Sequence, residues 1–379
     1  MIYFDYNATA PVMREAREAW LNVTEKIGGN PSSMHQFGAK AAAALAEARE
    51  KLAAFLGCKP QDIIWTSGAT EANNTVIHHF TEKLGANGEI WISSIEHPCV
   101  NDSAEHYFGK RAKKIPVTRD GVIDLEWFTQ EIADKRPGLV GVMAANNETG
   151  VIQPWRELLA ICQSYEVPFF TDAVQFIGKM PCDGLGECDF VSGAAHKFGG
   201  PRGVGFLKIP YRSQISPLLF GGKQERGFRA GTENVAIIAA MMAALEVREK
   251  QIARNEHLLR KLWRDNFERE FLHAIPGASI IGANVPRLWN TVFALMPDGE
   301  RKQEWVIRLD KAGFAVSTGS ACTTGKEEPS HVLSAMGYKT AQAVRAVRFS
   351  TGWETTEADW DALLKGLQKI GAELHPAKT

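Results

Sequence analysis

The sequence predicts an α/β fold in which a mainly parallel β-sheet is covered by helices on both faces. Short apolar runs alternate with stretches of helical periodicity along most of the chain, a pattern typical of parallel strands that are connected through helices. Polar residues follow several of these runs directly. Because binding sites in such sheets lie at the carboxyl ends of the strands, these polar residues are the first candidates for a functional site.

The expected strands of this sheet are short and apolar, and glycines or turn residues separate them from helical stretches. Leu45, Ala48, Leu52 and Leu56 recur at helical spacing and stop at Gly57, which predicts a helix there. A second helix is expected to end at about residue 84. The runs expected to form strands of this sheet are residues 63–66, 89–93, 139–145, 168–171, 190–191 and 204–207, and residues 2–5 are expected to form a separate short strand.

A second, smaller domain is expected in the last third of the chain. Residues 235–271 look like one long helical region, and mixed strand and helix signals return from about residue 275. Strand candidates there are residues 289–293 and 347–350, and residues 355–374 predict an amphipathic helix. We therefore expect a large domain of residues 12–250 and a small α+β domain of residues 1–11 and 251–379.

Composition and charge argue against several classes of partner. The 379 residues carry a formal net charge of −1, so no overall field favours nucleic acid or an anionic membrane. The N-terminus shows no apolar stretch typical of a signal or membrane-spanning segment, and we expect a cytoplasmic protein. The cysteines do not suggest a disulfide scaffold, and the spacing of Cys182 and Cys188 fits no common zinc motif, so we expect no metal.

An anion site is predicted where the run at residues 63–66 meets the sequence Ser-Gly-Ala-Thr-Glu. A strand, a glycine turn and a helix aim backbone N–H groups and the positive end of the helix at an anion. Thr70 is expected to cap this helix and to add a hydroxyl donor. The alternative is a capped helix that binds nothing.

Lys197 is the central candidate of the chain. It follows the run at residues 190–191 and stands in the sequence Gly-Ala-Ala-His-Lys-Phe-Gly-Gly-Pro, so it is expected on a loop that leaves a strand. Small residues around it allow close approach of a bulky ligand. An ordinary loop lysine remains the alternative for this segment taken alone.

Asp172, Gln175 and His97 also follow predicted strands. Asp172 could cap a helix, or it could hold the nitrogen of a pyridine ring protonated, with Gln175 bonded to a phenolic oxygen of the same ring. His97 could pack against the protein, or it could stack on a flat heteroaromatic ring.

Cys322 is the candidate nucleophile. It lies among small, hydroxylated and glycine-flanked positions, whereas buried structural cysteines prefer apolar neighbours. An accessible thiol on a mobile loop of the small domain suits covalent carriage of a group better than core packing.

The chain resembles cysteine desulfurases of the NifS/IscS type, which belong to the class V, fold-type I superfamily of pyridoxal-phosphate enzymes. The resemblance implies a large domain with a seven-stranded sheet. The segments that carry it are Tyr3-Phe4-Asp5-Tyr6-Asn7-Ala8-Thr9, Gly29-Asn30-Pro31-Ser32-Ser33-Met34-His35, Thr66-Ser67-Gly68-Ala69-Thr70-Glu71-Ala72-Asn73-Asn74, Glu96-His97, Asn146-Asn147-Glu148-Thr149-Gly150, Thr171-Asp172-Ala173-Val174-Gln175, His196-Lys197, Arg229-Ala230-Gly231-Thr232, Ser317-Thr318-Gly319-Ser320-Ala321-Cys322 and Arg348-Phe349-Ser350.

The resemblance implies a role for each candidate. Lys197 would carry pyridoxal 5'-phosphate, His97 would stack on its ring and move protons, Asp172 would pair with the ring nitrogen, and Gln175 would reach the phenolic oxygen. The phosphate would contact Ala69, Thr70, His196 and, from the second subunit of a homodimer, Thr232. Arg348 and Asn147 would orient the carboxylate of the substrate, L-cysteine.

The implied reaction converts L-cysteine to L-alanine and leaves the sulfur on Cys322 as a persulfide for an acceptor or scaffold protein. Iron–sulfur cluster assembly and thiolation are both open as destinations of the sulfur. Ala194 stands where the family usually has a phosphate-binding serine, and Ala10 where a threonine is common. A selenocysteine lyase, a class V aminotransferase and a non-catalytic binding partner remain alternatives.

Overall fold

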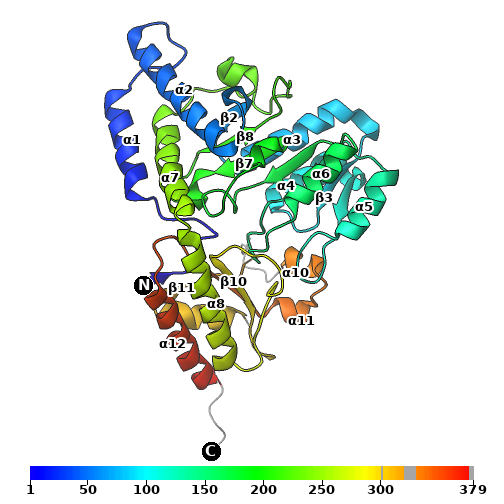
Figure 1. The fold of residues 1–379 in the computed structure, drawn as a ribbon, viewed down its shortest axis with the longest axis vertical. Helices are drawn as coiled ribbons and strands as arrows, with labels where there is room; N and C mark the ends of the chain where they lie inside the picture. The colour runs from blue at the N-terminus through cyan, green and yellow to red at the C-terminus, as the bar shows by residue number, and fades with distance from the viewer. Residues whose placement is uncertain (300–301, 320–329, 375–379) are drawn as a thin grey trace, which may run out of the picture.

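The computed structural model describes residues 1–299, 302–319 and 330–374. In Figure 1 the large sheet and its helices form the upper part of the molecule, and a smaller sheet with its own helices forms the lower part. The N-terminal strand β1 (Ile2–Tyr3) and the last described helix, α12 (Glu357–Leu374), both belong to the lower part. The described helices are α1 (Arg14–Lys26), α2 (Gln36–Leu56), α3 (Ala69–Leu84), α4 (Pro98–Phe108), α5 (Leu125–Asp134), α6 (Trp155–Ser164), α7 (Val235–Ala253), α8 (Glu256–Ala274), α9 (Lys302–Lys311), α10 (His331–Ala335), α11 (Thr340–Ala343) and α12 (Glu357–Leu374).

The large sheet of the described chain has seven strands in the order β2-β8-β7-β6-β5-β3-β4. Its strands are β2 (Ile63–Thr66), β3 (Ile90–Ser93), β4 (Ala112–Ile115), β5 (Leu139–Gly141), β6 (Phe169–Asp172), β7 (Phe190–Ala194) and β8 (Gly205–Lys208). Neighbouring strands from β7 to β4 pair in parallel, and only β8 runs antiparallel to its neighbours. The prediction of a mainly parallel sheet is therefore confirmed.

Alternate residues of each strand face opposite layers of helices, because the side-chain period of a strand is two. Trp91 and Phe169 pack into the core that contains α2, α5, α6 and α7. Ile92 and Phe170, one position further along the same strands, pack into the core beneath α3 and α4. Both faces are thus buried, which explains why the strands are apolar without alternation.

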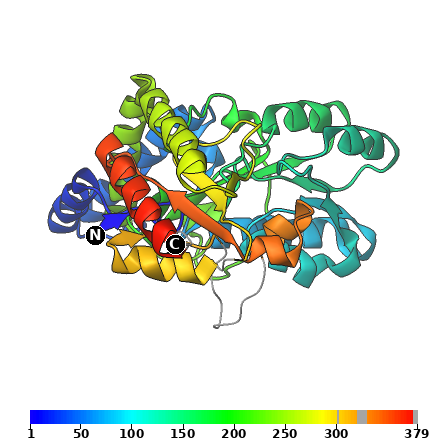
Figure 2. The ribbon, with the colours of Figure 1, turned by 90° about the horizontal axis from the view of Figure 1, so that it is seen from below.

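The lower part contains a three-stranded antiparallel sheet in the order β12-β10-β9, formed by β9 (Ser279–Ile280), β10 (Thr291–Leu295) and β12 (Ala346–Ser350). A separate parallel pair joins β1 (Ile2–Tyr3) to β11 (Phe314–Ala315). Phe4, Phe271, Phe349 and Trp360 belong to one core between the small sheet, α8 and α12. Figure 2 shows α12 in red along this part, seen from below.

Some sequence predictions differ from the structure in their boundaries. The expected single helical region at residues 235–271 is two helices, because Asn255 between α7 and α8 has φ of 57°, a left-handed conformation that asparagine tolerates and a helix does not. Strand β4 was missed because Lys113 and Lys114 give it little apolar character. It is an edge strand, where lysines discourage pairing with other chains.

The division into residues 12–250 and residues 1–11 with 251–379 stays a prediction. The distribution of the core supports it, since Phe4 packs with residues beyond 266 in one cluster, apart from the two clusters that cover the large sheet. No helix of the described residues is long and apolar enough to cross a membrane.

Phe271→Ala tests the core of the small sheet. Phe271 is fully buried and stacks on Phe267 with ring centroids 5.8 Å apart, so we expect the substitution to lower the free energy of unfolding by about 3–5 kcal/mol. The measurement is urea unfolding followed by fluorescence and circular dichroism. Leu272→Ala on the same helix is the control, because Leu272 is 41% exposed and should cost no more than about 0.5 kcal/mol. Equal effects of the two variants would contradict the assigned core.

Candidate active site

Lys197 lies immediately after strand β7, in a short 3-10 turn formed by Ala195–Lys197. Its Nζ donates hydrogen bonds to the backbone oxygens of Asn7 at 2.7 Å and Ala8 at 2.9 Å. Burial, and next the positive charge of Arg348, lower the pKa of Lys197 from 10.5 to about 8. About one tenth of this amine is therefore unprotonated at pH 7, far more than for an ordinary lysine, and the unprotonated form is the one that attacks a carbonyl group.

Asp172 is the last residue of strand β6, which is the neighbour of β7. Its side chain is buried, and Asn73 Nδ2 of helix α3 donates to Oδ2 at 2.7 Å. The backbone N–H of Val174 donates to the other oxygen at 3.0 Å. Asp172 thus makes the local contact expected of a cap and also a lateral contact to another element. The negative charge of Asp172 acts on Lys197 and on His97, so the three groups share one electrostatic environment.

His97 lies at the start of helix α4, which follows strand β3. Its Nδ1 is 3.0 Å from Cys99 Sγ and accepts from the backbone N–H of Cys99 at 3.2 Å. His97 is exposed at its outer side, yet partial burial of the imidazole lowers the pKa of His97. The negative charge of Asp172 raises this pKa, and the positive charge of Lys197 lowers it. A neutral ring is free to stack on an aromatic ligand or to accept a proton.

The strand, glycine turn and helix that predicted an anion site at the start of α3 are present, but Thr70 does not cap the helix. The helix begins at Ala69, the cap position is Gly68, and no side chain of the described residues satisfies the cap. The prediction that Thr70 is the cap was wrong, because the helix starts two residues earlier than its hydroxyl would require. The exposed Thr70 side chain and the first N–H groups of α3 therefore remain available to an anion.

Glycines allow the strand ends beside this helix to pack closely against it. A Cβ on Gly205 of strand β8 would lie 2.8 Å from the Cα of Gly68 and 2.5 Å from the backbone oxygen of Gly193. Only glycine lets these three backbone segments meet so closely. The N-terminus of α3 is thereby held beside the end of β7 that leads to Lys197.

His196 and Thr232 occupy different surroundings. His196 Nδ1 lies 3.2 Å from Thr9 Oγ1, and burial together with Lys197 lowers the pKa of His196 to about 4. Thr232 is exposed on the segment that precedes α7. Within the described residues, none of the hydrogen bonds made by Lys197, Asp172 or His97 involves Thr232.

Arg348 reaches the site from strand β12 of the small sheet. It is 3% exposed, and its Nη1 donates to the backbone oxygen of Asn147 at 2.9 Å. Nη2 donates to the carboxylate of Asp5 at 2.7 Å, while Nε is buried and has no hydrogen-bond partner among the described residues. A guanidinium with an open edge beside a carboxylate contact can bind a second carboxylate by sharing or replacing the first.

Cys322 lies outside the described residues, as do Ser320 and Ala321. The described residues on either side of this segment contact the site. Gly319 O is 3.4 Å from Arg348 Nη1, and Ser330 Oγ donates to Glu148 at 2.6 Å, one residue beyond Asn147. His331 Nε2 is 2.9 Å from the backbone oxygen of Glu96, the neighbour of His97.

A family model for aminotransferase class V matches residues 2–363. The chain belongs to the class V aminotransferase family. It is 40% identical to cysteine desulfurase IscS of Dictyoglomus turgidum over 99% of this chain and 95% of that protein. A solved NifS-like protein from Rickettsia africae is 33% identical, with a TM-score of 0.87 and coverage of 98% of this chain and 99% of the other. SspA in complex with cysteine is 28% identical, with a TM-score of 0.79 over 94% of this chain and all of the other. These likenesses show the NifS/IscS branch of the family and its fold-type I architecture.

Members of this family depend on pyridoxal 5'-phosphate, and the residues of this class V aminotransferase fit that group. The uncapped start of α3 offers N–H donors that suit a phosphate. Asp172 offers a buried carboxylate that suits a pyridinium nitrogen, and Lys197 offers an amine of lowered pKa that suits an aldehyde. The three kinds of group present therefore match the phosphate, the ring nitrogen and the aldehyde of the cofactor.

Sequence reasoning assigned no role to three residues that hold this site together. Asn73 bonds Asp172, Asn7 accepts from Lys197, and Lys179 donates to Gln175. Asn73 could have been noticed because it stands four residues after Ala69 on the same helix. Nothing in the local sequence around Asn7 or Lys179 indicates the long-range contacts they make.

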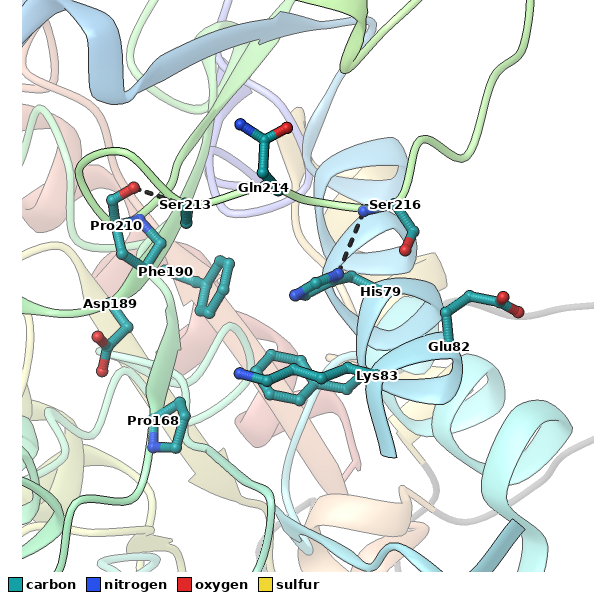
Figure 3. A pocket seen from close by; sticks show the side chains of 11 residues that line it. His79, Glu82, Lys83, Pro168, Asp189, Phe190, Pro210, Ser213, Gln214 and Ser216 are labelled. Atoms are coloured by element: carbon teal, nitrogen blue, oxygen red, sulfur yellow. Dashed lines mark hydrogen bonds between the residues drawn. The ribbon is translucent and has the colours of Figure 1, made fainter. Parts of the chain in front are cut away.

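A cavity of about 580 Å³ lies at another place on the large sheet. Pro168 and Asp189, which line it, directly precede strands β6 and β7, so this cavity is at the amino ends of those strands. Figure 3 shows His79 and Lys83 of α3 on one side of it, facing Phe190 and Pro168. The cavity contains none of the predicted site residues. No group of three or more metal-ligating side chains occurs in the part of the chain that the structure describes.

The lowered pKa of Lys197 gives a test on the protein freed of cofactor. Because the neutral amine is the reactive form, we expect its rate of labelling by an amine-directed reagent to rise with pH through a midpoint near 8. An ordinary exposed lysine has its midpoint near 10.4. Mass spectrometry of the Lys197 peptide at several pH values measures the rate, and peptides with exposed lysines serve as the reference. A midpoint for Lys197 at the reference value would contradict the burial of this amine.

Proposed function

We propose that this protein is a cysteine desulfurase that uses pyridoxal 5'-phosphate. It converts L-cysteine to L-alanine and transfers the sulfur to the thiol of Cys322, which becomes a persulfide. The observation that carries the proposal is the buried amine of Lys197, whose pKa is lowered to about 8, in one electrostatic environment with Asp172 at the carboxyl ends of β6 and β7. The full-length similarity to cysteine desulfurases supports the same conclusion.

Each contact of the cofactor is assigned to one part of the site. Lys197 would hold its aldehyde group, Asp172 would face its ring nitrogen, Gln175 would face its phenolic oxygen, and the imidazole of His97 would lie against its ring. Thr70, the N–H groups of Ala69 and Thr70, and His196 hold its phosphate. When bound, the cofactor supplies a protonated ring that draws electrons from the substrate and so weakens its C–S bond.

Asn73 supports this assignment, because its amide donates to Asp172 Oδ2 at 2.7 Å and so holds the carboxyl group in place for the ring nitrogen. The missing hydroxyl at Ala194 removes one phosphate donor that the family usually has, so the N-terminus of α3 carries more of the phosphate binding here.

The substrate is held by its carboxylate and positioned for proton transfer. Arg348 binds the carboxylate through the edge that carries Nε, which has no hydrogen-bond partner among the described residues. The side-chain amide of Asn147, whose backbone oxygen accepts from Arg348, is assigned to the same carboxylate. The amine of Lys197 takes the α-proton of cysteine, and its lowered pKa suits both removal and return of a proton near neutral pH. His97, whose pKa is lowered by burial, is the second group assigned to proton exchange.

The sulfur step balances without any other reactant. The thiolate of Cys322 attacks the sulfur of cysteine, the C–S bond breaks as an S–S bond forms, and the carbon that loses sulfur gains a proton to give alanine. The persulfide then passes its terminal sulfur to an acceptor thiol, for iron–sulfur cluster assembly or thiolation. The flanks of the 320–329 segment already contact Arg348 and Glu148, which brings both ends of this segment to the site.

A homodimer completes the phosphate site, because the exposed Thr232 would reach the phosphate of the second subunit. The exposed position of Thr232 and the lack of a hydrogen bond to the described catalytic groups of its own chain support this assignment.

Cys322→Ala tests the persulfide. With L-cysteine as substrate and a thiol reductant present, we expect alanine and sulfide formation to fall by at least about 100-fold, because no other group can take the sulfur as efficiently. Alanine is quantified by chromatography, sulfide by a colorimetric assay, and the persulfide by mass spectrometry of the Cys322 peptide. Cys58→Ala, at a partly exposed position outside the site, should retain wild-type rates. Sulfide release that survives unchanged in Cys322→Ala would instead favour a lyase that needs no persulfide.

Subunit complementation tests the dimer. Lys197→Ala and Thr232→Ala should each lower activity at limiting cofactor, since each damages a different part of the same composite site. Hybrid dimers of the two variants contain one intact site, so randomly mixed dimers should reach about one quarter of the wild-type rate. Activity of the mixture equal to the mean of the two separate variants would show that Thr232 does not serve the second subunit.

A further inference from the structure

Lys179 is a second lysine beside the active site, and the proposed reaction does not use it. It lies in the turn that follows strand β6, seven residues after Asp172, and it is 3% exposed. Burial lowers the pKa of Lys179 well below its usual value, and the positive charges of Lys197 and Arg348 lower it further. Burying a lysine costs free energy unless its amine is hydrogen-bonded, so its hydrogen-bond partners matter.

Both described hydrogen bonds of the Lys179 amine go to amide oxygens. Nζ donates to Oε1 of Gln175 at 2.6 Å and to Oδ1 of Asn7 at 3.1 Å. Gln175 is the residue assigned to the phenolic oxygen of the cofactor, and Asn7 is the residue whose backbone oxygen accepts from Lys197. The buried amine therefore lies directly behind the groups that face the cofactor.

These contacts determine which end of the Gln175 amide faces the site. Its oxygen is turned to Lys179, and its Nε2 donates to the backbone oxygen of Asn7 at 2.9 Å, the same oxygen that accepts from Lys197. With the amide reversed, two oxygens would face each other at Asn7. The amide of Asn7 is fixed in the same way, since Asn290 donates to its Oδ1 at 3.0 Å and its Nδ2 donates to Thr291 at 2.9 Å.

Two tryptophans hold the backbone of Lys179 in place. The indole N–H of Trp289 donates to the backbone oxygen of Lys179, and that of Trp353 donates to Gly178, each at 2.9 Å. The two indoles are buried with ring centroids 4.8 Å apart. Gly178 has φ of 75°, and a Cβ there would lie 2.4 Å from Cβ of Phe198, the residue after Lys197. The segment therefore has little freedom to move away from Gln175.

We propose that Lys179 is a positioning residue that, held by Trp289 and Trp353, fixes the Gln175 amide with its N–H₂ group toward the cofactor. The inference rests on the proposed function, because Gln175 contacts the cofactor only if pyridoxal 5'-phosphate is bound to Lys197. Lys179 itself is expected to touch neither cofactor nor substrate. Its effect should therefore appear in the properties of the bound cofactor and depend on Gln175.

The test uses the full-length holoenzyme and Lys179→Met, which keeps the length of the side chain but removes its donors. We expect the visible absorbance maximum of bound pyridoxal 5'-phosphate to move, and its dissociation constant to rise about tenfold, as loss of one well-placed hydrogen bond predicts. Gln175→Met should produce the same changes. Adding Lys179→Met to Gln175→Met should change them no further, because Lys179 acts through Gln175.

Lys208→Met is the matched control. Lys208 is also buried and donates to a backbone oxygen, that of Cys188, but it lies at the opposite end of strand β8 from the site. The Lys208→Met variant should be less stable than the wild type, but the absorbance of its bound cofactor should not change. Thermal unfolding of all variants separates the two effects. If Lys179→Met does not fold, Trp289→Phe, which removes the donor to the Lys179 backbone, should shift the absorbance in the same direction by a smaller amount.

An unchanged cofactor spectrum and affinity in folded Lys179→Met would overturn the inference, as would additive effects of Lys179→Met and Gln175→Met. If Lys179→Met does not fold, an unchanged spectrum in Trp289→Phe would overturn it as well. These results leave the proposed function intact. A wild-type protein that binds no pyridoxal 5'-phosphate, shown by absorbance and by borohydride reduction, would instead overturn the proposed function and the inference together. Bound cofactor without alanine formation from cysteine would overturn only the desulfurase reaction.

Discussion

The site depends on the backbone oxygen of Asn7, which accepts hydrogen bonds from both Lys197 and Gln175. Asn7 belongs to the N-terminal segment, which pairs with strand β12 of the small sheet through a β-bridge between Asp5 and Ser350. Lys197 and Gln175, in contrast, follow strands of the large sheet. The side chain of Asn7 is 1% exposed and bonds the Asn147 backbone and Thr291. Because every polar atom of this residue that faces the interior is paired, a shift of the segment would leave several buried groups without partners, each at a cost of about 1–3 kcal/mol. One residue thus couples the two sheets at the position where they meet the lysine.

The parallel sheet explains why distant segments of the sequence meet at this position. Strands β3, β5, β6 and β7 are neighbours and run in the same direction, so the residues that follow them arrive at one edge. Those residues include His97, Asn147, Asp172 and Lys197. The chain order β3, β4, β5 places β4 on one side of β3 and β5 on the other, so the direction of strand addition reverses there. Ligands of parallel sheets bind at the carboxyl ends of the strands, near the point where the strand order reverses. The candidate site lies at the same carboxyl ends. The cavity at the amino ends of β6 and β7 lies on the opposite edge and has a different lining.

Local sequence was sufficient for the elements that have a strong pattern and for the residues that end them. The strands at Ile63–Thr66 and Phe169–Asp172, the helix that stops at Gly57, and the loop position of Lys197 all follow from apolar runs and breakers nearby. Strand β4 could not be predicted in this way, since an edge strand with two lysines has no apolar run. The prediction that Thr70 caps α3 was wrong because the exact start of a helix depends on its neighbours, and here Gly68 packs closely against Gly205. The contacts of Asn7, Asn73 and Lys179 could not be predicted, because their partners are far away in the sequence.

Arg348 illustrates how the same N-terminal segment adjusts the charge of the site. A guanidinium that is 3% exposed needs an anion close by, and Asp5 supplies one at 2.7 Å. The side chain of Asp5 is 24% exposed and that of Arg348 only 4%, so Asp5 is the partner that can turn toward water while the arginine stays in place. A substrate carboxylate that replaces Asp5 would exchange one negative charge for another next to Arg348. The pKa of Lys197 responds to Arg348, Asp172 and Asp5, and this exchange would leave its electrostatic surroundings nearly unchanged when the substrate binds. The proposed role of Lys197, to take a proton and return it, benefits from a constant pKa, because neither transfer then becomes much harder than the other.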